Sequence, residues 1–438
     1  MKKTILLGAI SAVASLWLNN SANAQEAPVN PLDTQAVSIL KLKNDLDLLK
    51  KIKISGYLQA QFQVADSNGI KSFAGGDFPA NADKRFSVRR GRFKIAYDNA
   101  LALYTIQVDV TEKGVGIKDA YVKITDPWTK ALSLQAGVFD RPFGFEISYS
   151  SSMRETPERS RLFQTIFPDE REVGAKLTFQ PPKTSKWNFL KIEGGIFNGS
   201  GPKAVDFDYQ KDFIGNIGIN KTNKKENINW GIRASYYNGG WRQNTSKVYT
   251  IASDSLGLNA FERDKDTLNY GAIAKRQYIG ADAQISIDWV AGITSLRAEY
   301  IQGQQPGTSS TSKSPETQPT SDTYIRNFNG AYFYFLQNIA HTKHQLVLKY
   351  DWYDPNTDVE GDNIGKTVTA PSGKTFAKTG TTDLKYTTIG IGWVYRWDTN
   401  VKFTAYYDMV TNETTKNIAL WGKDLTDNVF TLRMQYKF

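Results

Sequence analysis

The stretch TLRMQYKF, residues 431–438, alternates polar and apolar side chains without a break. Successive side chains of a β-strand point to opposite faces, so this pattern predicts a strand with one polar and one apolar face. The polar face would carry Thr431, Arg433, Gln435 and Lys437, and the apolar face Leu432, Met434, Tyr436 and Phe438. A half-buried strand of a soluble sandwich and a wall strand of a membrane barrel both fit this pattern, and the rest of the chain must distinguish them.

The same two-residue period recurs from Lys53 onward in sixteen segments, whose connectors alternate in length. Short turns are expected at 98–99, 126–129, 181–186, 222–226, 289–291, 339–343 and 398–400. Loops are expected at 67–83, 112–114 (the one short loop), 141–171, 198–211, 238–268, 303–325, 354–382 and 413–426. Transmembrane barrels have short periplasmic turns and long extracellular loops, whereas soluble sandwiches show no such alternation. We therefore predict an all-β fold, a 16-stranded antiparallel transmembrane β-barrel over residues 53–438.

Residues 1–24 have the features of a cleaved secretory signal peptide. Two lysines precede a short apolar run, and small residues precede an expected cleavage site between Ala24 and Gln25. The apolar run is too short for a membrane anchor, and polar residues follow it at once. We therefore expect export of the chain.

Residues 25–52 differ from the barrel segment because their apolar residues recur at helical spacing. Ile39, Leu42, Leu46 and Leu49 lie three or four residues apart, as on one face of a short helix. The pattern spans fewer than two heptads, which is too short to indicate a stable coiled coil. A frayed periplasmic helix and a stub that helps copies associate both remain open.

The composition narrows the classes of partner and chemistry. The formal net charge is +10, and removal of residues 1–24, with two lysines and no acids, leaves +8. A basic surface or cavity attracts anions, but no short basic cluster dominates and the chain is exported, so nucleic acid is not an expected partner. The chain has no cysteine, which excludes disulfides and thiolate chemistry.

The two histidines, His341 and His344, are expected in a short turn without a third metal ligand nearby. We therefore expect no metal, no other cofactor and no enzymatic activity. The enzymatic alternative is a hydrolase built on the same barrel. It would need one of these histidines beside an outward-facing serine, and neither lies on an expected strand next to one.

Three stretches carry a family resemblance: FSVRRGRFKIAYD (86–98), IKDAYVKITDPW (117–128) and AGVFDRPFGFEISYSSSMRETPERSRLFQTIFPDEREVGAKL (136–177). The R-R-x-R strand, the K-D-A-Y strand and the G-x-F-x-x-P-F-G opening of a long loop resemble, in this order, the phosphate-selective porin O/P family. The clearest match covers about residues 53–200. The resemblance implies a homotrimeric, sixteen-stranded channel for anions in the outer membrane of a Gram-negative bacterium, with lipid and lipopolysaccharide as partners.

The first of these stretches places Arg90, Arg92 and Lys94 on one face of the expected strand. Each Arg or Lys on the lipid side of a barrel costs roughly 2–4 kcal/mol near the midplane, so this face is expected to line the lumen. The three cations would form a ladder with steps of about 7 Å, along which an anion exchanges partners. Lys123 is expected on the same lumenal surface. By alternation, Arg89 is expected to face lipid headgroups or a loop.

Acidic residues on neighbouring strands leave a second interpretation open. Asp109 and Asp119 are also expected to face the lumen, where they could neutralise Arg90 and Arg92 in wall salt bridges that set no selectivity. Bases outnumber acids at the inward positions, so some bases remain unpaired, which favours the ladder. Lys437 is expected at the periplasmic rim, far enough from the ladder to affect anion passage much less.

The connector 141–171 is too long for a passive link and carries many charges, which predicts a constriction folded into the barrel. Its candidate residues are Arg141, Glu146, Arg154, Glu155, Glu158, Arg159 and Arg161. With the flanking acids, acidic residues outnumber basic ones there. Such a constriction would create a transverse field and pass zwitterions or sugars as well as anions, so strict phosphate selectivity is not expected.

Together these patterns predict a porin: a water-filled channel for passive diffusion of small anionic or polar solutes. The first alternative is an accessory or structural barrel that is plugged by its loops and recruited into a larger envelope complex. The barrel hydrolase is the lesser alternative. The sequence does not identify the solute.

Overall fold

The computed structural model describes residues 31–203 and 205–438, in two separate units. The first unit contains the helix α1 (Pro31–Leu49), which confirms the helix predicted near the N-terminus. Its apolar side chains from Ile39 to Leu49 are exposed within this unit. The predicted signal peptide and its cleavage site, Ala24 and Gln25, lie outside the described residues, and the domain boundaries stay predictions.

The second unit is a closed antiparallel barrel of sixteen strands, as predicted. The barrel strands are β1 (Ile52–Ala65), β2 (Lys84–Asp98), β3 (Ala102–Thr111), β4 (Gly114–Thr125), β5 (Leu132–Asp140), β6 (Arg171–Phe179), β7 (Leu190–Phe197), β8 (Asp212–Thr222), β9 (Ile228–Arg242), β12 (Ile273–Trp289), β13 (Gly292–Gly307), β14 (Thr323–Asn338), β15 (His344–Asp354), β17 (Tyr386–Arg396), β18 (Val401–Asn412) and β19 (Val429–Lys437). β19 pairs with β1 and closes the wall, which leaves no sheet edge exposed to lipid.

The connectors contain short additional elements. These are the strands β10 (Val248–Ser253), β11 (Asn259–Asp264) and β16 (Phe376–Ala377), the helix α2 (Arg161–Ile166), and three 3-10 turns, η1 (Thr267–Asn269), η2 (Gly361–Asn363) and η3 (Thr381–Asp383). In the described part of the chain, no helix is both long and apolar enough to cross a membrane.

The last strand, β19, has the two faces that its sequence predicts. Thr431, Arg433 and Gln435 are buried on the lumenal face, whereas Leu432 and Met434 are each 47% exposed on the outer face. At the end of β19, the backbone N–H of Phe438 donates to the carbonyl of Gly56 at 3.0 Å. The apolar face is therefore the one offered to the membrane interior.

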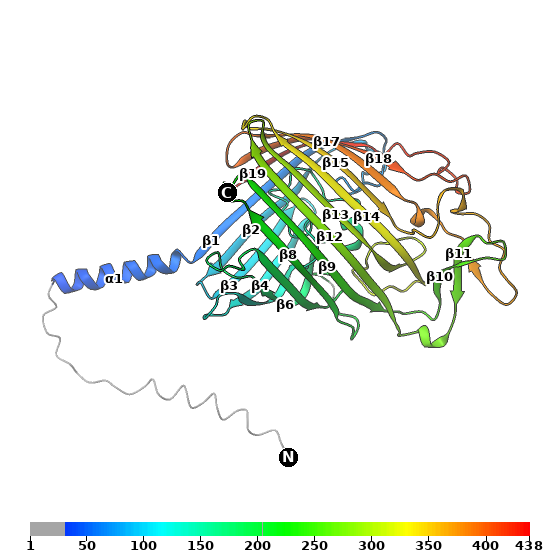
Figure 1. Cartoon of the computed structure of the whole chain (residues 1–438), viewed down its shortest axis with the longest axis horizontal. Coiled ribbons are helices and arrows are strands. Elements are labelled where there is room, and N and C mark those ends of the chain that lie inside the picture. The colour runs from blue at the N-terminus through cyan, green and yellow to red at the C-terminus, as the bar shows by residue number, and fades with distance from the viewer. Residues whose placement is uncertain (1–30, 204) are drawn as a thin grey trace, which may run out of the picture. The chain divides into compact units, whose positions relative to one another are not determined.

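Short and long connectors alternate around the barrel and lie at opposite ends. The C-terminus marks the turn end in Figure 1, and β10 and β11 mark the long-loop end. In outer-membrane barrels the long loops are extracellular and the short turns periplasmic. The strands also differ in height. β5, β6 and β7 have 9, 9 and 8 residues, whereas β12, β13 and β14 have 17, 16 and 16, which gives the barrel a low side and a tall side.

Two β-bulges change which side chains enter the lumen. The register of β2 on β1 shifts at Arg89, and that of β4 on β3 shifts at Lys118. A bulge inserts one extra residue and interrupts the alternation of faces. As a result, Arg89 and Arg90 both point inward, as do Lys118 and Asp119. Arg89 was expected to face outward, toward lipid headgroups or a loop, and the outward direction was wrong: its Nε lies 2.8 Å from the carboxylate of the loop residue Glu158 inside the barrel.

Candidate functional site

Residues 141–170, hereafter the inner loop, fold into the barrel and pack against its tall side. The loop contributes Phe143, Ile147, Leu162, Phe163, Ile166 and Phe167 to a buried apolar cluster that includes Tyr237, Tyr278, Phe328 and Tyr332 of the wall. The ring of Phe167 lies 5.8 Å from that of Tyr278, and the ring of Phe163 lies 6.2 Å from that of Tyr332. Full burial of such side chains contributes roughly 1.5–3 kcal/mol each, so the loop is held to one wall.

The start of the inner loop is fixed by a turn that only glycine permits. Gly144 has φ +63°, and a Cβ there would overlap the Glu299 carboxylate. The N–H groups of Phe145 and Glu146 donate to Glu299 at 3.1 and 3.2 Å, and the Gly144 N–H donates to Ser235 at 3.0 Å. The P-F-G motif therefore directs the chain from the end of β5 across the lumen and fixes it to β9 and β13.

A cavity of about 390 Å³ lies between the inner loop and strands β1 to β6 and β19. Six bases line it, Arg92, Lys94, Arg159, Arg171, Lys176 and Lys437, against two acids, Asp119 and Asp140. Neutral polar side chains complete its surface, among them Tyr57, Tyr121, Gln107, Gln135, Ser148, Ser150, Ser151 and Ser152. The loop thus fills the tall side of the lumen and leaves a polar, basic space on the opposite side.

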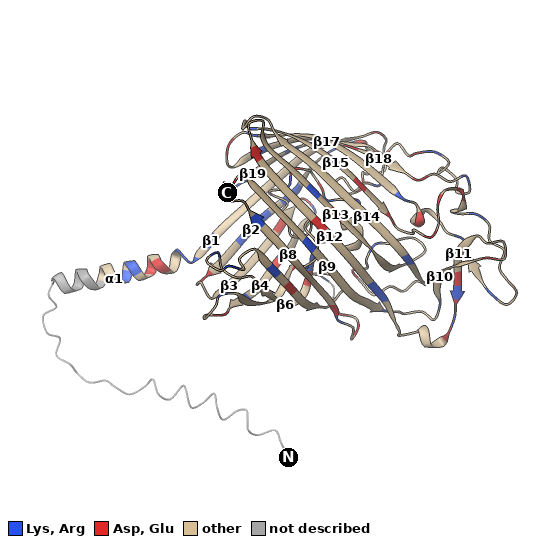
Figure 2. Cartoon of the chain, viewed as in Figure 1, with Lys and Arg blue, Asp and Glu red and all other residues tan. Residues whose placement is uncertain are grey.

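Four of these six bases are held in ion pairs. The pairs are Arg92–Asp109 at 3.3 Å, Arg171 with Asp119 at 3.0 Å and with Asp140 at 2.8 Å, Lys176–Glu193 at 2.8 Å, and Arg159–Glu170. Lys94 and Lys437 have no ion pair within residues 31–203 and 205–438. Bases and acids are interspersed along the strands in Figure 2, and the positive excess of the cavity rests on these two lysines.

Of the three cations in the predicted ladder, two are therefore held in ion pairs. Arg90 is bound to Glu158, with Nη2 2.6 Å from Oε2, and Arg92 is bound to Asp109. Asp119 pairs with Arg171 instead of Arg90. Lys123 lies opposite Gln135 on the neighbouring strand and does not line the cavity. Lys437, which we expected to affect anion passage much less because of its distance from the ladder, lines the same cavity as Lys94.

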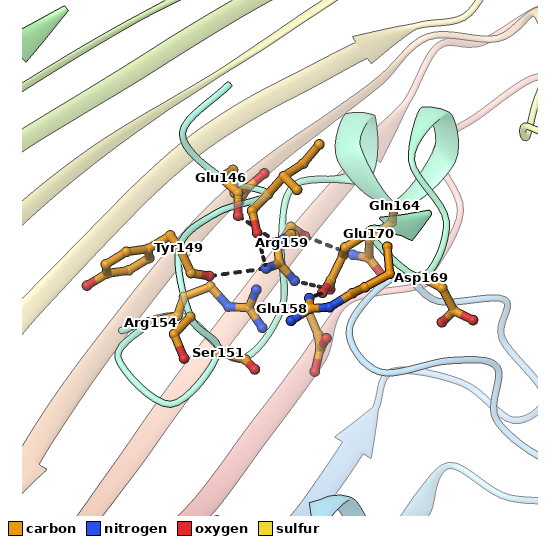
Figure 3. A network of polar contacts seen from close by, with 12 residues as sticks. Glu146, Tyr149, Ser151, Arg154, Glu158, Arg159, Gln164, Asp169 and Glu170 are labelled. Carbon is orange, nitrogen blue, oxygen red and sulfur yellow. Dashed lines mark hydrogen bonds and ion pairs between the residues drawn. The ribbon is translucent and has the colours of Figure 1, made fainter. Parts of the chain in front are cut away.

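The remaining candidate residues of the inner loop form a second set of contacts. Arg141 pairs with Glu172 at 2.9 Å, Glu155 pairs with Arg297 at 2.9 Å, Glu146 accepts from Ser160 and Tyr334, and Arg161 stacks on Phe73 and Tyr386. Figure 3 shows Arg159 at the centre of the loop, where it donates to the carbonyls of Glu146 and Tyr149 and pairs with Glu170. The contacts of Arg159 brace the loop from within, whereas the other contacts tie it to the barrel wall and to the connector between β1 and β2.

Two loop carboxylates are strongly stabilised in their charged form. Despite burial, which opposes charge, Arg89 and Arg90 hold the pKa of Glu158 well below its usual range. Arg159 and Arg171 do the same for the pKa of Glu170. Both acids are therefore negative at neutral pH and cancel part of the lumenal positive charge.

A second cavity, of about 20 Å³, lies on the long-loop side of the inner loop. Lys71, Phe73, Arg161, Lys349 and Asp427 are among its lining residues. Glu158 and Arg159 also line it, and Arg159 lines the larger cavity as well. The central arginine of the loop thus separates the two spaces.

Sequence reasoning identified the charges of the inner loop but missed the apolar residues that hold it. Leu162, Phe163, Ile166 and Phe167 recur at helical spacing through α2, a signal that was present in the sequence. Sequence reasoning also missed the inward orientation of Lys118, because the position of a bulge cannot be predicted from a two-residue period.

The two histidines lie near the turn end of the barrel. His341 binds Asp288 at 2.6 Å, and His344 stacks on Tyr395 with ring centroids 4.8 Å apart. Among the residues that the structure describes, no group of three or more His, Cys, Asp or Glu side chains is placed to hold a metal ion.

The family model of the phosphate-selective porins O and P matches residues 68–438. The chain belongs to this family. This porin is accordingly an outer-membrane β-barrel, and its family and fold are those of channel-forming proteins.

Two solved structures share the barrel fold with this porin. One is the anion-selective porin from Comamonas acidovorans, 9% identical, covering 88% of this chain and 99% of that chain with a TM-score of 0.50. The other is the outer membrane channel DcaP of Acinetobacter baumannii, 11% identical, covering 88% of this chain and 97% of that chain with a TM-score of 0.50. At these identities the likeness concerns the fold alone. A comparison with curated proteins found no match.

Proposed function

We propose that this porin passes small anions, together with small polar solutes, through the space between the inner loop and strands β1 to β6. The observation that carries the proposal is the lining of the larger cavity, where Lys94 and Lys437 lie without acidic partners among the described residues. The charges of four other candidate residues are held in ion pairs and shape the local electric field; these are Arg90, Arg92, Asp109 and Asp119. The paired charges of the wall hold each other, and the two lysines remain available to a passing ion.

The strength with which the two lysines attract anions depends on the effective dielectric constant of the narrow, partly water-filled space. Two unit charges about 4 Å apart interact by roughly 1 kcal/mol in bulk water and about 4 kcal/mol at an effective dielectric near 20. Two unpaired ammonium groups therefore bias entry toward anions. Binding stays weak enough for release because neither lysine is part of a closed cage.

Strict phosphate selectivity does not follow from this lining. Serines of the inner loop, Ser148, Ser150, Ser151 and Ser152, offer hydroxyl groups to the same cavity. Hydroxyls hydrogen-bond neutral polar solutes as readily as anions. We propose a general, anion-leaning channel whose passage is diffusion and involves no catalytic step.

Single-channel recording on the purified full-length protein tests the open channel. Discrete conductance steps in planar bilayers support it. A correctly folded barrel that never conducts would show instead that the inner loop plugs the lumen, as in an accessory barrel of a larger envelope complex.

We further propose a homotrimer in the outer membrane, surrounded by lipid and lipopolysaccharide, as the family resemblance implies. The low side of the barrel is the proposed contact between copies. The chain has no cysteine, so single cysteines can be introduced at Leu134 on the low side and at Phe333 on the tall side. A bifunctional maleimide should join copies through Leu134→Cys and not through Phe333→Cys. Deletion of residues 25–50 should leave the oligomer intact, because α1 is too short to hold it.

A further inference from the structure

The carboxylate of Glu158 is enclosed by three arginines from the barrel wall. Arg89 donates to it at 2.8 and 2.9 Å, Arg90 at 2.6 and 3.2 Å, and Arg433 at 2.8 Å. Glu158 is 6% exposed. Two of the arginines bind in the forked geometry that suits the two oxygens of a carboxylate. The wall therefore forms a receptor for a carboxylate, and a loop residue occupies it.

A fourth arginine beside this receptor has no counter-ion in the described structure. Arg154 is 4% exposed, and its Nε and Nη1 have no hydrogen-bond partner. Its Nη2 donates only to the carbonyl of Pro157, at 3.3 Å. Figure 3 shows Arg154 and Glu158 in the same network of the inner loop. Three guanidinium groups thus bind the Glu158 carboxylate, and a fourth lies beside it without an ion pair among the described residues.

A purely structural role does not account for this arrangement. One arginine would suffice to neutralise Glu158, and each further buried cation adds repulsion and desolvation. The chain also breaks the regular ladder of β2 to bring Arg89 to the inside. Such a surplus of buried donors is suited to holding a negative ligand.

The receptor lies at the smaller cavity, next to a loop residue that lines both cavities. Glu158 lines the smaller cavity on the long-loop side, and its neighbour Arg159 lines both cavities. Glu158 belongs to the inner loop, whereas Arg89, Arg90 and Arg433 belong to the wall. A shift of the loop would withdraw the carboxylate and expose the arginines.

We infer that Arg89, Arg90, Arg433 and Arg154 form a carboxylate-binding site on the permeation route, in which Glu158 is a tethered occupant that competes with permeating carboxylate solutes. The inference rests on the proposed anion route and assigns Glu158 as the residue that sets the affinity for carboxylates. Removal of Glu158 turns a weakly interacting channel into one that retains a small carboxylate.

Chemical rescue of the missing carboxylate tests the inference. In Glu158→Ala, acetate should occupy the vacated receptor and reduce the chloride conductance saturably, with half-block at a concentration at least about tenfold lower than in the wild type. Acetamide, which has the same shape without the charge, should have no effect. Glu155→Ala, which removes another loop acid whose one ion pair among the described residues is with Arg297, is the matched control and should behave like the wild type toward acetate. Equal acetate sensitivity in all three proteins would overturn the inference.

A second variant covers failure of Glu158→Ala to fold. Glu158→Gln keeps the shape and removes the charge, so its channels should prefer chloride over potassium more strongly than the wild type, and Glu155→Gln should change the preference less. A folded Glu158→Gln protein with wild-type ion preference would equally overturn the inference. Absence of any conductance in the wild type would instead contradict the proposed channel function. Failure of the carboxylate site and failure of the channel function therefore give different results.

Discussion

Lys94 follows Arg92 by two residues on β2, and both side chains line the larger cavity, but only Arg92 is held in an ion pair, with Asp109 at 3.3 Å. The two cations therefore have different roles although they occupy equivalent positions of the strand. A paired arginine presents little net charge to a passing ion, whereas an unpaired lysine presents its full charge.

Replacement of the unpaired lysine should weaken anion selectivity. Lys94→Gln is expected to lower the chloride-to-potassium permeability ratio by about threefold to tenfold, which corresponds to roughly 0.7–1.4 kcal/mol. The reversal potential in a salt gradient measures the ratio. The effect should be largest in dilute electrolyte, because salt screens charges over about 10 Å at 0.1 M. Lys437→Gln should act in the same direction.

The matched control removes a complete ion pair. Arg92→Gln combined with Asp109→Asn changes no net charge and should leave the permeability ratio close to that of the wild type. If the double variant lowers the ratio as much as Lys94→Gln does, paired and unpaired bases contribute alike and the distinction between them is wrong.

The apolar cluster should control the width of the channel. Phe163→Ala removes a buried aromatic side chain that holds the inner loop to the tall side, and truncation of such residues typically costs about 3–5 kcal/mol of packing. The loosened loop is expected to increase conductance fluctuations and mean conductance in single-channel recordings. Phe213→Ala on the lipid face of β8 is the control. Quiet, wild-type conductance in a folded Phe163→Ala protein would show that other contacts suffice to hold the loop.

Asp427 should make anion preference depend on pH. It lies in the loop before β19 and lines the smaller cavity, where burial raises its pKa to about 6, with Asp424 and Asp66 adding to the rise and Arg161 opposing it. The carboxylate is charged at pH 7 and largely neutral at pH 5. Anion preference should therefore increase as the pH falls from 7 to 5, and Asp427→Asn should remove this increase.

The same group should also affect stability, in the same direction of pH. An acid with a raised pKa binds its proton more tightly in the folded state, so its contribution to stability is present at low pH and is lost as the pH rises from about 4 to 6. Thermal unfolding of the wild type and Asp427→Asn at pH 4 and pH 7 measures it. Identical pH profiles of preference and stability in the two proteins would exclude Asp427 as the titrating group.

The orientation of the barrel can be checked with single cysteines, since the chain has none of its own. Ser309→Cys lies in the connector between β13 and β14 and should react with an impermeant maleimide on intact cells. Lys183→Cys lies in the turn between β6 and β7 and should react only after the outer membrane is opened. The reverse pattern would invert the assignment of extracellular and periplasmic ends.

The barrel could be predicted from the sequence because side chains along each strand face the lumen and the lipid alternately. Polar and apolar residues therefore alternate with a two-residue period. TLRMQYKF shows both faces of β19, and the alternation of connector lengths distinguishes the barrel from a soluble sandwich. The number of strands, their order and a folded-in loop, predicted at 141–171, followed from these local signals and from the family resemblance.

Contacts between residues far apart in the sequence could not be predicted from such local patterns. Glu158 meets Arg433 across 275 positions of sequence, and nothing local marks that pair. The inward turn of Arg89 depends on a bulge, which breaks the alternation from which faces are assigned. The position of Lys437 in the cavity follows from the closure of β19 on β1, which places the end of the chain beside its first strand.

The reversal potential of wild-type channels in a tenfold potassium chloride gradient measures whether the proposed channel prefers anions. We expect open channels whose reversal potential has the sign of chloride preference, and a preference that grows as the salt is diluted. Channels that prefer potassium at every salt concentration would contradict it.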